Sequence, residues 1–371
     1  MSKINVRSPY HIYHTIANLT SATLDLYIYT GEQITDRPAV TYSLTSTAYN
    51  ASVTFEISEL VRDYLDVTFA GAYVSQMVWV DYQITEYVSA VAQTPLTIVP
   101  LSAYDGYGYF EDGVNPQNTS DKLQSNSVIY KNDDSPIRLP VLSDGAKTIK
   151  FFNNGVEVYT TTLSALVVSS TIIKYISDAG DGIDSYKERV IADGGTYEDS
   201  ACLQAFLDTL DIFPVDTIHI ITASGLEIIK VKTIEECKHT PYKITFVNKF
   251  GALQDLWFFK RTDTKLNTSD NKYKSNILSG GTYSSSSHQN RILNKQGQET
   301  LTLNTGFYAE EYNEVFRQLM LSEKVWIEMD SVTLPINISS SSMAFKTVLN
   351  DKLISYTIDA SFAYDKINSV R

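Results

Sequence analysis

Cysteine is scarce in this sequence, and Cys202 and Cys237 are the only two in 371 residues. Two cysteines without a CxxC spacing make neither a disulfide framework nor a metal-ligand cluster, which excludes the disulfide-rich secreted classes. Histidine is also rare, and no third ligand lies near the closest pair, His11 and His14. Because a zinc site needs at least three protein ligands held together, we expect no metal site.

Long apolar runs and basic runs are missing as well. No segment approaches the ~20 apolar residues of a membrane-spanning helix, and the opening residues, MSKINVRSPYHIYH, lack the apolar core of a secretory signal. Lys and Arg number 30 against 43 Asp and Glu, which gives a net charge of −13. Nucleic acid binding needs clustered cations, and anionic membranes repel an acidic protein. We therefore expect a chain made in the cytoplasm that binds neither nucleic acid nor membranes.

The usual catalytic motifs are absent: the sequence contains no GxSxG, no P-loop and no GxGxxG. Glu111 and Asp112 could form a glycosidase carboxylate pair, but adjacent side chains point apart and such enzymes need acids across a cleft. Residues 178–184 (DAGDGID) carry carboxylates at loop spacing, yet Gly180 stands where a calcium-binding EF-hand needs a ligand. We expect neither enzymatic activity nor a cofactor.

Aromatic and β-branched residues are abundant instead, with 25 Tyr and 15 Phe. These residue types suit half-buried pleated surfaces, so the composition predicts a mostly β protein with a few short helices. The length allows two or three domains at roughly 150 residues each. We predict a β-sandwich domain at residues 1–145, a middle β-domain at residues 146–245 and an α+β domain at residues 246–371.

Local patterns support these predictions. Residues 23–30 (TLDLYIYT) and 74–84 alternate apolar and polar side chains, as half-buried strands do. Residues 57–66 (ISELVRDYLD) place their apolar side chains on one face and predict a short helix. The pair Asn154-Gly155 lies between two alternating segments, which predicts a β-hairpin because both central positions of its turn need a positive φ.

The predicted C-terminal domain has the clearest helix of the chain, at residues 308–321. Its apolar residues recur at helical spacing and include Phe316, whereas Gln318 falls on the predicted exposed face. Residues 324–329 and 354–364 alternate as strands do. We expect the helix to pack on the sheet that contains residues 354–364.

A long loop at residues 104–121 interrupts the first predicted domain. It is rich in Gly, Asp and Asn, and long loops in compact domains usually serve binding or assembly. Its four aromatic residues argue against disorder, since disordered inserts are poor in aromatics. The predicted subunit interface consists of Tyr104, Tyr107, Tyr109 and Phe110.

Several phrases of the sequence resemble virion structural proteins of tailed bacteriophages, above all those of the tail and baseplate region. They are SPYHIYH, LDLYIYTG, VTFEISELVRDYL, YDGYGYFEDGVN, NKFGALQDLWFFKR and LNDKLISYTIDASFAYDKIN. They lie toward both ends of the chain and are packing signatures rather than catalytic motifs. The resemblance implies a non-enzymatic tail, baseplate or tail-adaptor subunit that assembles into a symmetric oligomer and connects neighbouring virion proteins. It also implies assembly in the host cytoplasm and release by lysis.

A second hypothesis stays open beside this one. A receptor- or carbohydrate-binding β-sandwich module, such as an adhesin or a fibre-associated protein, would use the same aromatic loops. Aromatic rings serve protein interfaces and sugar stacking alike. Ring formation or co-assembly with virion proteins favours the first hypothesis, and glycan binding by a monomer favours the second.

Overall fold

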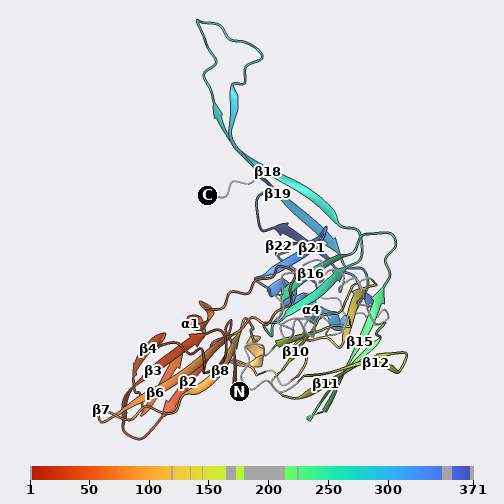
Figure 1. Cartoon of the computed structure of the whole chain (residues 1–371). Helices are drawn as coiled ribbons and strands as arrows, with labels where there is room; N and C mark the ends of the chain where they lie inside the picture. Colours follow the sequence, from red (N-terminus) through yellow and green to blue (C-terminus); the bar gives the residue numbers. More distant parts are fainter. Residues whose placement is uncertain are drawn as a thin grey trace, which may run out of the picture. The chain divides into compact units, whose positions relative to one another are not determined.

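The computed structural model describes residues 2–117, 120–133, 135–143, 145–163, 173–178, 214–223, 225–344 and 353–367. Strands dominate these residues and helices are few and short, which confirms the predicted mostly β class (Figure 1). Within this described part, no helix is long and apolar enough to cross a membrane. The chain forms two compact units. Unit 1 comprises Met1–Glu235, Thr245–Leu256 and Glu314–Ser322, and unit 2 comprises Glu236–Ile244, Trp257–Asn313 and Glu323–Arg371.

The first sheet of unit 1 has the strand order β1-β8-β6-β3-β4, and β7 pairs with β6. Its strands are β1 (Ser2–Asn5), β3 (Leu19–Tyr29), β4 (Tyr42–Thr47), β6 (Val78–Val88), β7 (Val91–Ala92) and β8 (Val99–Tyr104). The predicted alternation is confirmed in β3, where Leu24, Leu26 and Ile28 are buried. The strand predicted at residues 74–84 begins later, at Val78.

A smaller sheet and a short helix share the core of this sheet. Strand β2 (His11–Thr15) pairs with β5 (Ser52–Glu56), and helix α1 (Ser58–Arg62) follows directly, shorter than the predicted 57–66. Their buried side chains join those of β3, β6 and β8 in one apolar cluster. Two layers with a common core make this part of unit 1 a β-sandwich.

The second large sheet of unit 1 has the order β12-β11-β14-β15-β9. Its strands are β9 (Val128–Asn132), β11 (Lys147–Asn153), β12 (Val156–Leu163), β14 (Thr217–Thr222) and β15 (Gly225–Ile234), and nearby β10 (Leu139–Leu142) pairs with β13 (Ile173–Ile176). The predicted hairpin is confirmed between β11 and β12, with φ of 50° at Asn154 and 77° at Gly155. These sheets enclose their own apolar core.

Unit 2 contains a sheet with the strand order β21-β22-β24-β19-β18. Its strands are β18 (Asp263–Lys274), β19 (Asn290–Asn304), β21 (Val325–Met329), β22 (Val332–Ile338) and β24 (Thr357–Phe362), and a separate pair joins β20 (Tyr308–Ala309) to β23 (Leu353–Ile354). Strands β16 (Tyr242–Val247) and β17 (Leu253–Phe258) each divide between the units. The strands predicted at 324–329 and 354–364 correspond to β21 and β24.

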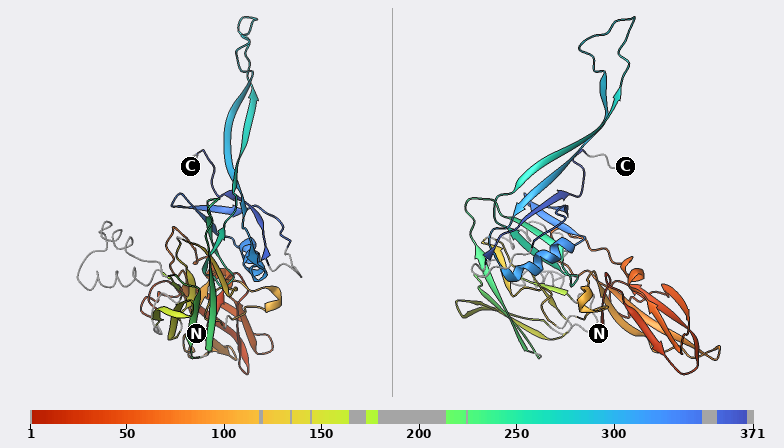
Figure 2. Two further views of the ribbon diagram at one scale, coloured as in Figure 1. Left: turned by 90° about the vertical axis from the view of Figure 1, so that its right-hand side faces the viewer. Right: turned by 180° about the vertical axis from the view of Figure 1, so that it is seen from behind.

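A long hairpin extends beyond the rest of this sheet, as Figures 1 and 2 show. Strand β18 has 12 residues and every one of them is exposed. Strand β19 has 15 residues, of which the first six are exposed. We call residues 264–298 the arm. The sequence pattern did not predict these two strands.

The C-terminal helix is shorter than predicted and one of its faces differs. Residues Tyr308–Ala309 form a strand, a 3₁₀ turn (η2) covers Glu310–Tyr312, and helix α4 begins at Asn313 and ends at Leu321. Phe316 is buried, as predicted, but Gln318 is buried too, so its predicted exposure was wrong. Hydrogen bonds to neighbouring polar groups explain how an amide can be buried there.

The predicted domain boundaries at residues 145 and 245 do not coincide with the boundaries of the two units. Residues Glu314–Ser322 belong to unit 1, whereas β24 belongs to unit 2. The division into three domains therefore stays a prediction, as does the packing of the helix on the sheet of residues 354–364.

Candidate functional site

The candidate site lies in unit 1, where the predicted interface loop leaves β8. The backbone turns at Gly106, which forms an isolated β-bridge with Phe250, and the N–H of Tyr107 donates to the carbonyl of Lys249 over 2.9 Å. Tyr104 lies in an apolar cluster with Trp79 and other buried residues. The first part of the loop is thereby fixed to the body of unit 1.

The end of the loop closes the edge of the first sheet. Strand β1 is the outermost strand, so one side of its backbone has no neighbouring strand. Gln117 accepts from the N–H of Lys3 over 3.0 Å and donates to its carbonyl over 2.8 Å. Asn115 does the same for Asn5, at 3.1 and 3.0 Å. Side-chain amides thus replace a further strand and satisfy groups that would otherwise invite pairing with another chain.

The turn at Gly106 leaves no room for a side chain. A Cβ atom there would lie 2.6 Å from Oδ1 of Asn5 and 2.8 Å from the carbonyl oxygen of Lys249. Backbone atoms cannot move aside as a flexible side chain can. Glycine at this position therefore allows the loop to approach β1 and the turn at Lys249 closely.

We expect Gly106→Ala to lower the free energy of unfolding by about 1–3 kcal/mol, because crowding a packed position costs about that much. Gly145→Ala is the matched control, since a Cβ at Gly145 would meet no atom within 4 Å. Urea unfolding of both variants measures the difference. Equal stability of the two variants would contradict the close packing at Gly106.

A polar network joins the middle of the loop to helix α4. The hydroxyl of Tyr109 donates to Oε1 of Glu314 over 2.7 Å, and Nε2 of Gln318 donates to the same oxygen over 2.9 Å. The cations of Lys249 and Arg317 lie 5.0 and 5.8 Å from the centre of the Tyr109 ring. Charges of both signs surround one aromatic ring, which holds it in a single orientation.

Tyr107 is buried next to Tyr109, which belongs to this network. The guanidinium of Arg7 lies 4.7 Å from the centre of its ring, and the ring packs edge-on against Tyr109. Burial raises the pKa of the Tyr107 phenol to about 12, against the opposing effect of the Arg7 cation. Glu314 and Arg317 also face this phenol, and their charges have opposite effects on it.

This pKa predicts a loss of stability in alkali. The unfolded chain ionises the phenol near pH 10, whereas the folded chain does so near pH 12. The stabilisation is complete below pH 10 and is lost as the pH rises to 12, because the unfolded state releases its proton first. Tyr107→Phe should make this loss smaller, as denaturant unfolding across that pH range can measure. The remaining loss comes from other buried phenols, since burial also raises the pKa values of Tyr73, Tyr109 and Tyr175.

Tyr13→Phe provides a control with the opposite sign. The hydrogen bond between the exposed Tyr13 hydroxyl and Ser52 lowers the pKa of Tyr13. Its ionisation therefore favours the folded state in alkali, and removing it should make the loss of stability slightly steeper. An alkaline loss as steep in Tyr107→Phe as in wild type would show that burial of Tyr107 does not contribute to it.

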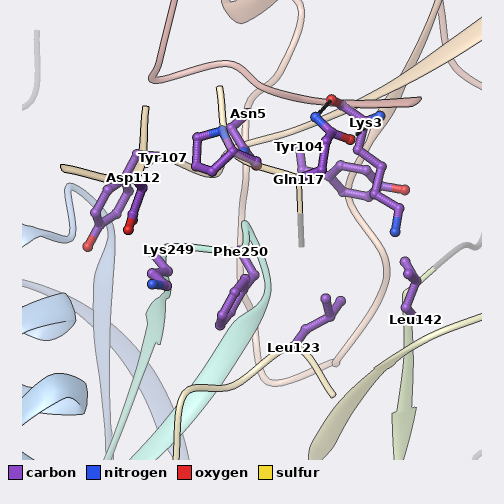
Figure 3. A pocket seen from close by; sticks show the side chains of 11 residues that line it. Lys3, Asn5, Tyr104, Tyr107, Asp112, Gln117, Leu123, Leu142, Lys249 and Phe250 are labelled. Atoms are coloured by element: carbon purple, nitrogen blue, oxygen red, sulfur yellow. Dashed lines mark hydrogen bonds between the residues drawn. The ribbon is translucent and has the colours of Figure 1, made fainter. Parts of the chain in front are cut away.

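A cavity of about 260 Å³ lies between the loop, β1 and the turn at Phe250 (Figure 3). Its wall combines aromatic rings, amides, cations and one carboxylate. The lining residues are Lys3, Asn5, Tyr104, Tyr107, Asp112, Pro116, Gln117, Leu123, Leu142, Lys249 and Phe250. Aromatic faces beside hydrogen-bonding groups are typical of small-molecule sites.

The structure places the four predicted interface residues very differently. Tyr104 and Tyr107 are buried inside the chain, and Tyr109 is half-buried and bonded to Glu314. Phe110 alone among the four is fully exposed, at the start of a short 3₁₀ turn (η1, Phe110–Asp112). An interface at these residues stays a prediction, and Phe110 is the side chain that reaches solvent.

The sequence alone did not indicate that Asn115, Gln117 and Lys249 belong to this site. The two amides occur at alternate positions, Asn-Pro-Gln, which matches the spacing of outward-facing residues on a strand. That spacing was the one available signal. Lys249 comes from a distant turn, and nothing near the loop in the sequence indicates it.

The calcium candidate lies largely outside the described residues. Asp178 is described, and its carboxylate accepts from Nζ of Lys131 over 2.7 Å and from the N–H of Ile137 over 2.8 Å. Both oxygens of Asp178 are therefore engaged. No group of three or more possible ligands occurs in the part of the chain that the structure describes.

We expect EDTA to leave the melting temperature unchanged, because the sequence contains no complete set of metal ligands. A structural metal would stabilise the fold, and its removal would lower the melting temperature. Scanning calorimetry with and without EDTA measures this directly. A fall of several degrees that added Ca²⁺ reverses would implicate residues 178–184 and contradict the prediction.

Comparison with known proteins does not assign the chain to a family. No protein-family model matches the sequence, and no curated protein matches it. A solved structure described as CBD12 from CALX1.2 matches 47% of this chain and 70% of its own, with 8% identity and a TM-score of 0.17. Another, the calcium binding domain CBD12 of CALX1.1, matches 62% and 96% at 8% identity, also with a TM-score of 0.17. Similarity this weak supports no conclusion about fold or function.

Proposed function

We propose that this chain is a non-enzymatic structural subunit of a tailed-phage virion. Its station is the tail, the baseplate or an adaptor between them, where it forms a symmetric oligomer and contacts other virion proteins. The sequence phrases that resemble such proteins support this proposal. The predicted assembly in the host cytoplasm and release by lysis belong to the same proposal.

The observation that carries the proposal is the arm. All 12 residues of β18 are exposed, and so are the first six of β19. A two-stranded hairpin alone is at best marginally stable in water. An element of this length that gains nothing from its own chain's core is best explained by contacts with another molecule.

Phe110 adds a second candidate contact, in unit 1. Its ring is fully exposed although the neighbouring loop residues are fixed to the body of the unit. An aromatic side chain held outward on a rigid turn is a common anchor in protein interfaces.

Localisation in purified particles tests the proposal. Mass spectrometry of gradient-purified virions should find the chain, and gold-labelled antibody should mark one end of the tail in electron micrographs. Antibody against a host cytoplasmic protein controls for contamination. Absence of the chain from particles that remain infectious would refute a structural role.

The cavity in unit 1 favours a second candidate function, carbohydrate or receptor binding. Aromatic rings of Tyr104 and Phe250 and the amide of Gln117 line it together, and sugars are held by such combinations of stacking and hydrogen bonding. Glycan-array binding by the purified chain tests this function. Loss of that binding in Phe250→Ala, but not in Tyr283→Ala, which removes an exposed ring of unit 2, would assign it to the cavity.

A further inference from the structure

The arm lacks the neighbours that a strand pair normally has. Strand β19 pairs with β24 only over Thr300–Asn304, although it pairs with β18 as far out as Asn290. The C-terminal segment contacts the arm at Gly297, whose carbonyl accepts from the N–H of Lys366, and at Gln296, whose side-chain amide exchanges two hydrogen bonds with the backbone of Ile367. Further out, no third strand joins the ribbon among the described residues. Both backbone edges are therefore available for strand addition.

The arm also exposes large apolar side chains on an element without a core. These side chains are between 45% and 74% exposed. The six residues are Leu266, Tyr273, Leu278, Tyr283, Ile292 and Leu293. Apolar groups gathered on one projecting element indicate a protein contact rather than a solvated surface.

The charge of the arm is opposite to that of the remaining chain. Residues 264–298 contain Lys265, Lys272, Lys274, Arg291 and Lys295 against Asp270, a net charge of +4. The whole chain carries −13, so the remainder carries −17. A basic arm on a strongly acidic body is attracted to the body of another copy of the same chain.

The free edge of the first sheet in unit 1 fits such an arm. Strand β4 ends that sheet, and its sequence, YSLTST, contains neither proline nor charge to prevent pairing. The segment that follows helix α1 lies beside β4, since the ring centroids of Tyr42 and Tyr64 are 6.1 Å apart and the charge of Asp63 acts on Tyr42. Asp63 is exposed, and helix α1 carries the exposed Glu59 one turn earlier. The opposite edge, β1, is already closed by Asn115 and Gln117.

We propose that the arm of one copy pairs with strand β4 of a second copy, with arm cations opposite Glu59 and Asp63. This inference rests on the proposed function, because it names the partner within the oligomer. Backbone hydrogen bonds along β4 supply affinity, and the charges select the acidic edge. Each copy then has one arm and one free β4 edge, so it can bind one copy through its arm and a further copy through β4.

Reciprocal charge reversal tests this contact. One variant carries Lys274→Glu and Arg291→Glu on the arm, and the other carries Glu59→Lys and Asp63→Lys beside β4. All four side chains are exposed, so both variants should fold. In sedimentation velocity, each variant alone should self-associate about tenfold more weakly than wild type, because attraction becomes repulsion. An equimolar mixture of the two should recover the association, since every contact again joins opposite charges.

Lys230→Glu with Lys238→Glu is the control, because it makes the same charge change at exposed positions outside the arm. Its self-association should equal that of wild type. The proposal is overturned if wild type stays monomeric at all concentrations, if the control weakens equally, or if the mixture fails to recover. It is also overturned if the arm variant is lost from particles while purified wild type is monomeric, because the arm would then bind a different virion protein. These outcomes concern self-association, whereas absence from particles refutes the proposed function itself.

Discussion

Asp178→Ala should lower the free energy of unfolding by about 3–5 kcal/mol, the usual cost of leaving one partner of a buried ion pair without the other. Asp178 is completely buried, and the side chain of Lys131 is only 5% exposed. The substitution leaves a buried ammonium without its carboxylate and the N–H of Ile137 without its acceptor. Chemical denaturation of unit 1, followed by its tyrosine and tryptophan signals, measures the loss.

Two further variants separate charge from packing. Lys131→Met combined with Asp178→Asn removes both charges but keeps an acceptor for Ile137, so it should be more stable than Asp178→Ala alone. Glu157→Ala breaks the exposed pair with Lys150, which has the same 2.7 Å distance, and should change stability little. If Asp178→Ala behaved like Glu157→Ala, burial would not be what makes the first pair important.

Phe316→Ala should cost about 3–5 kcal/mol, the range for a buried phenylalanine truncated to alanine. Phe316 has no exposed surface in helix α4, so the substitution loses transfer free energy and leaves a cavity. Leu321→Ala on the same helix is the control, since that side chain is 46% exposed. It should cost about 1 kcal/mol or less, because it loses little buried area.

Denaturant melts of these two helix variants decide whether the apolar face of α4 is core or contact surface. A contact surface would leave the stability of the monomer unchanged in Phe316→Ala and would weaken assembly instead. Such a result would contradict the burial of Phe316 in the chain.

The sequence predicted those elements whose burial repeats at a regular spacing. Strand β3 alternates in the sequence because one of its faces is core, and the Asn154-Gly155 turn was predictable because few residues adopt positive φ readily. The arm was missed for the converse reason. Because β18 buries none of its residues, selection for a core imposes no alternation on it.

In the candidate site, too, the sequence pattern does not predict which polar side chains are buried. A polar residue on a helix is assigned to the exposed face by periodicity, which is why Gln318 was predicted wrongly. Its burial depends on Ser125 and Glu314, and Ser125 lies far away in the sequence. Likewise the aromatic loop was recognisable, but which of its rings face inward depends on Lys249 and Arg7, which the loop sequence does not reveal.

The hydrogen bonds of the Asn115 and Gln117 side chains to β1 make the two edges of the first sheet unlike. One of its edges is sealed by side chains of the same chain, and the other, β4, remains open. With β1 sealed, two copies cannot join their first sheets by pairing β1 of one copy with β4 of the other. Pairing of β4 with the arm of another copy joins two unlike surfaces, so the contact is head-to-tail. Such a contact closes into a ring when the rotation between copies is right and otherwise continues as a filament.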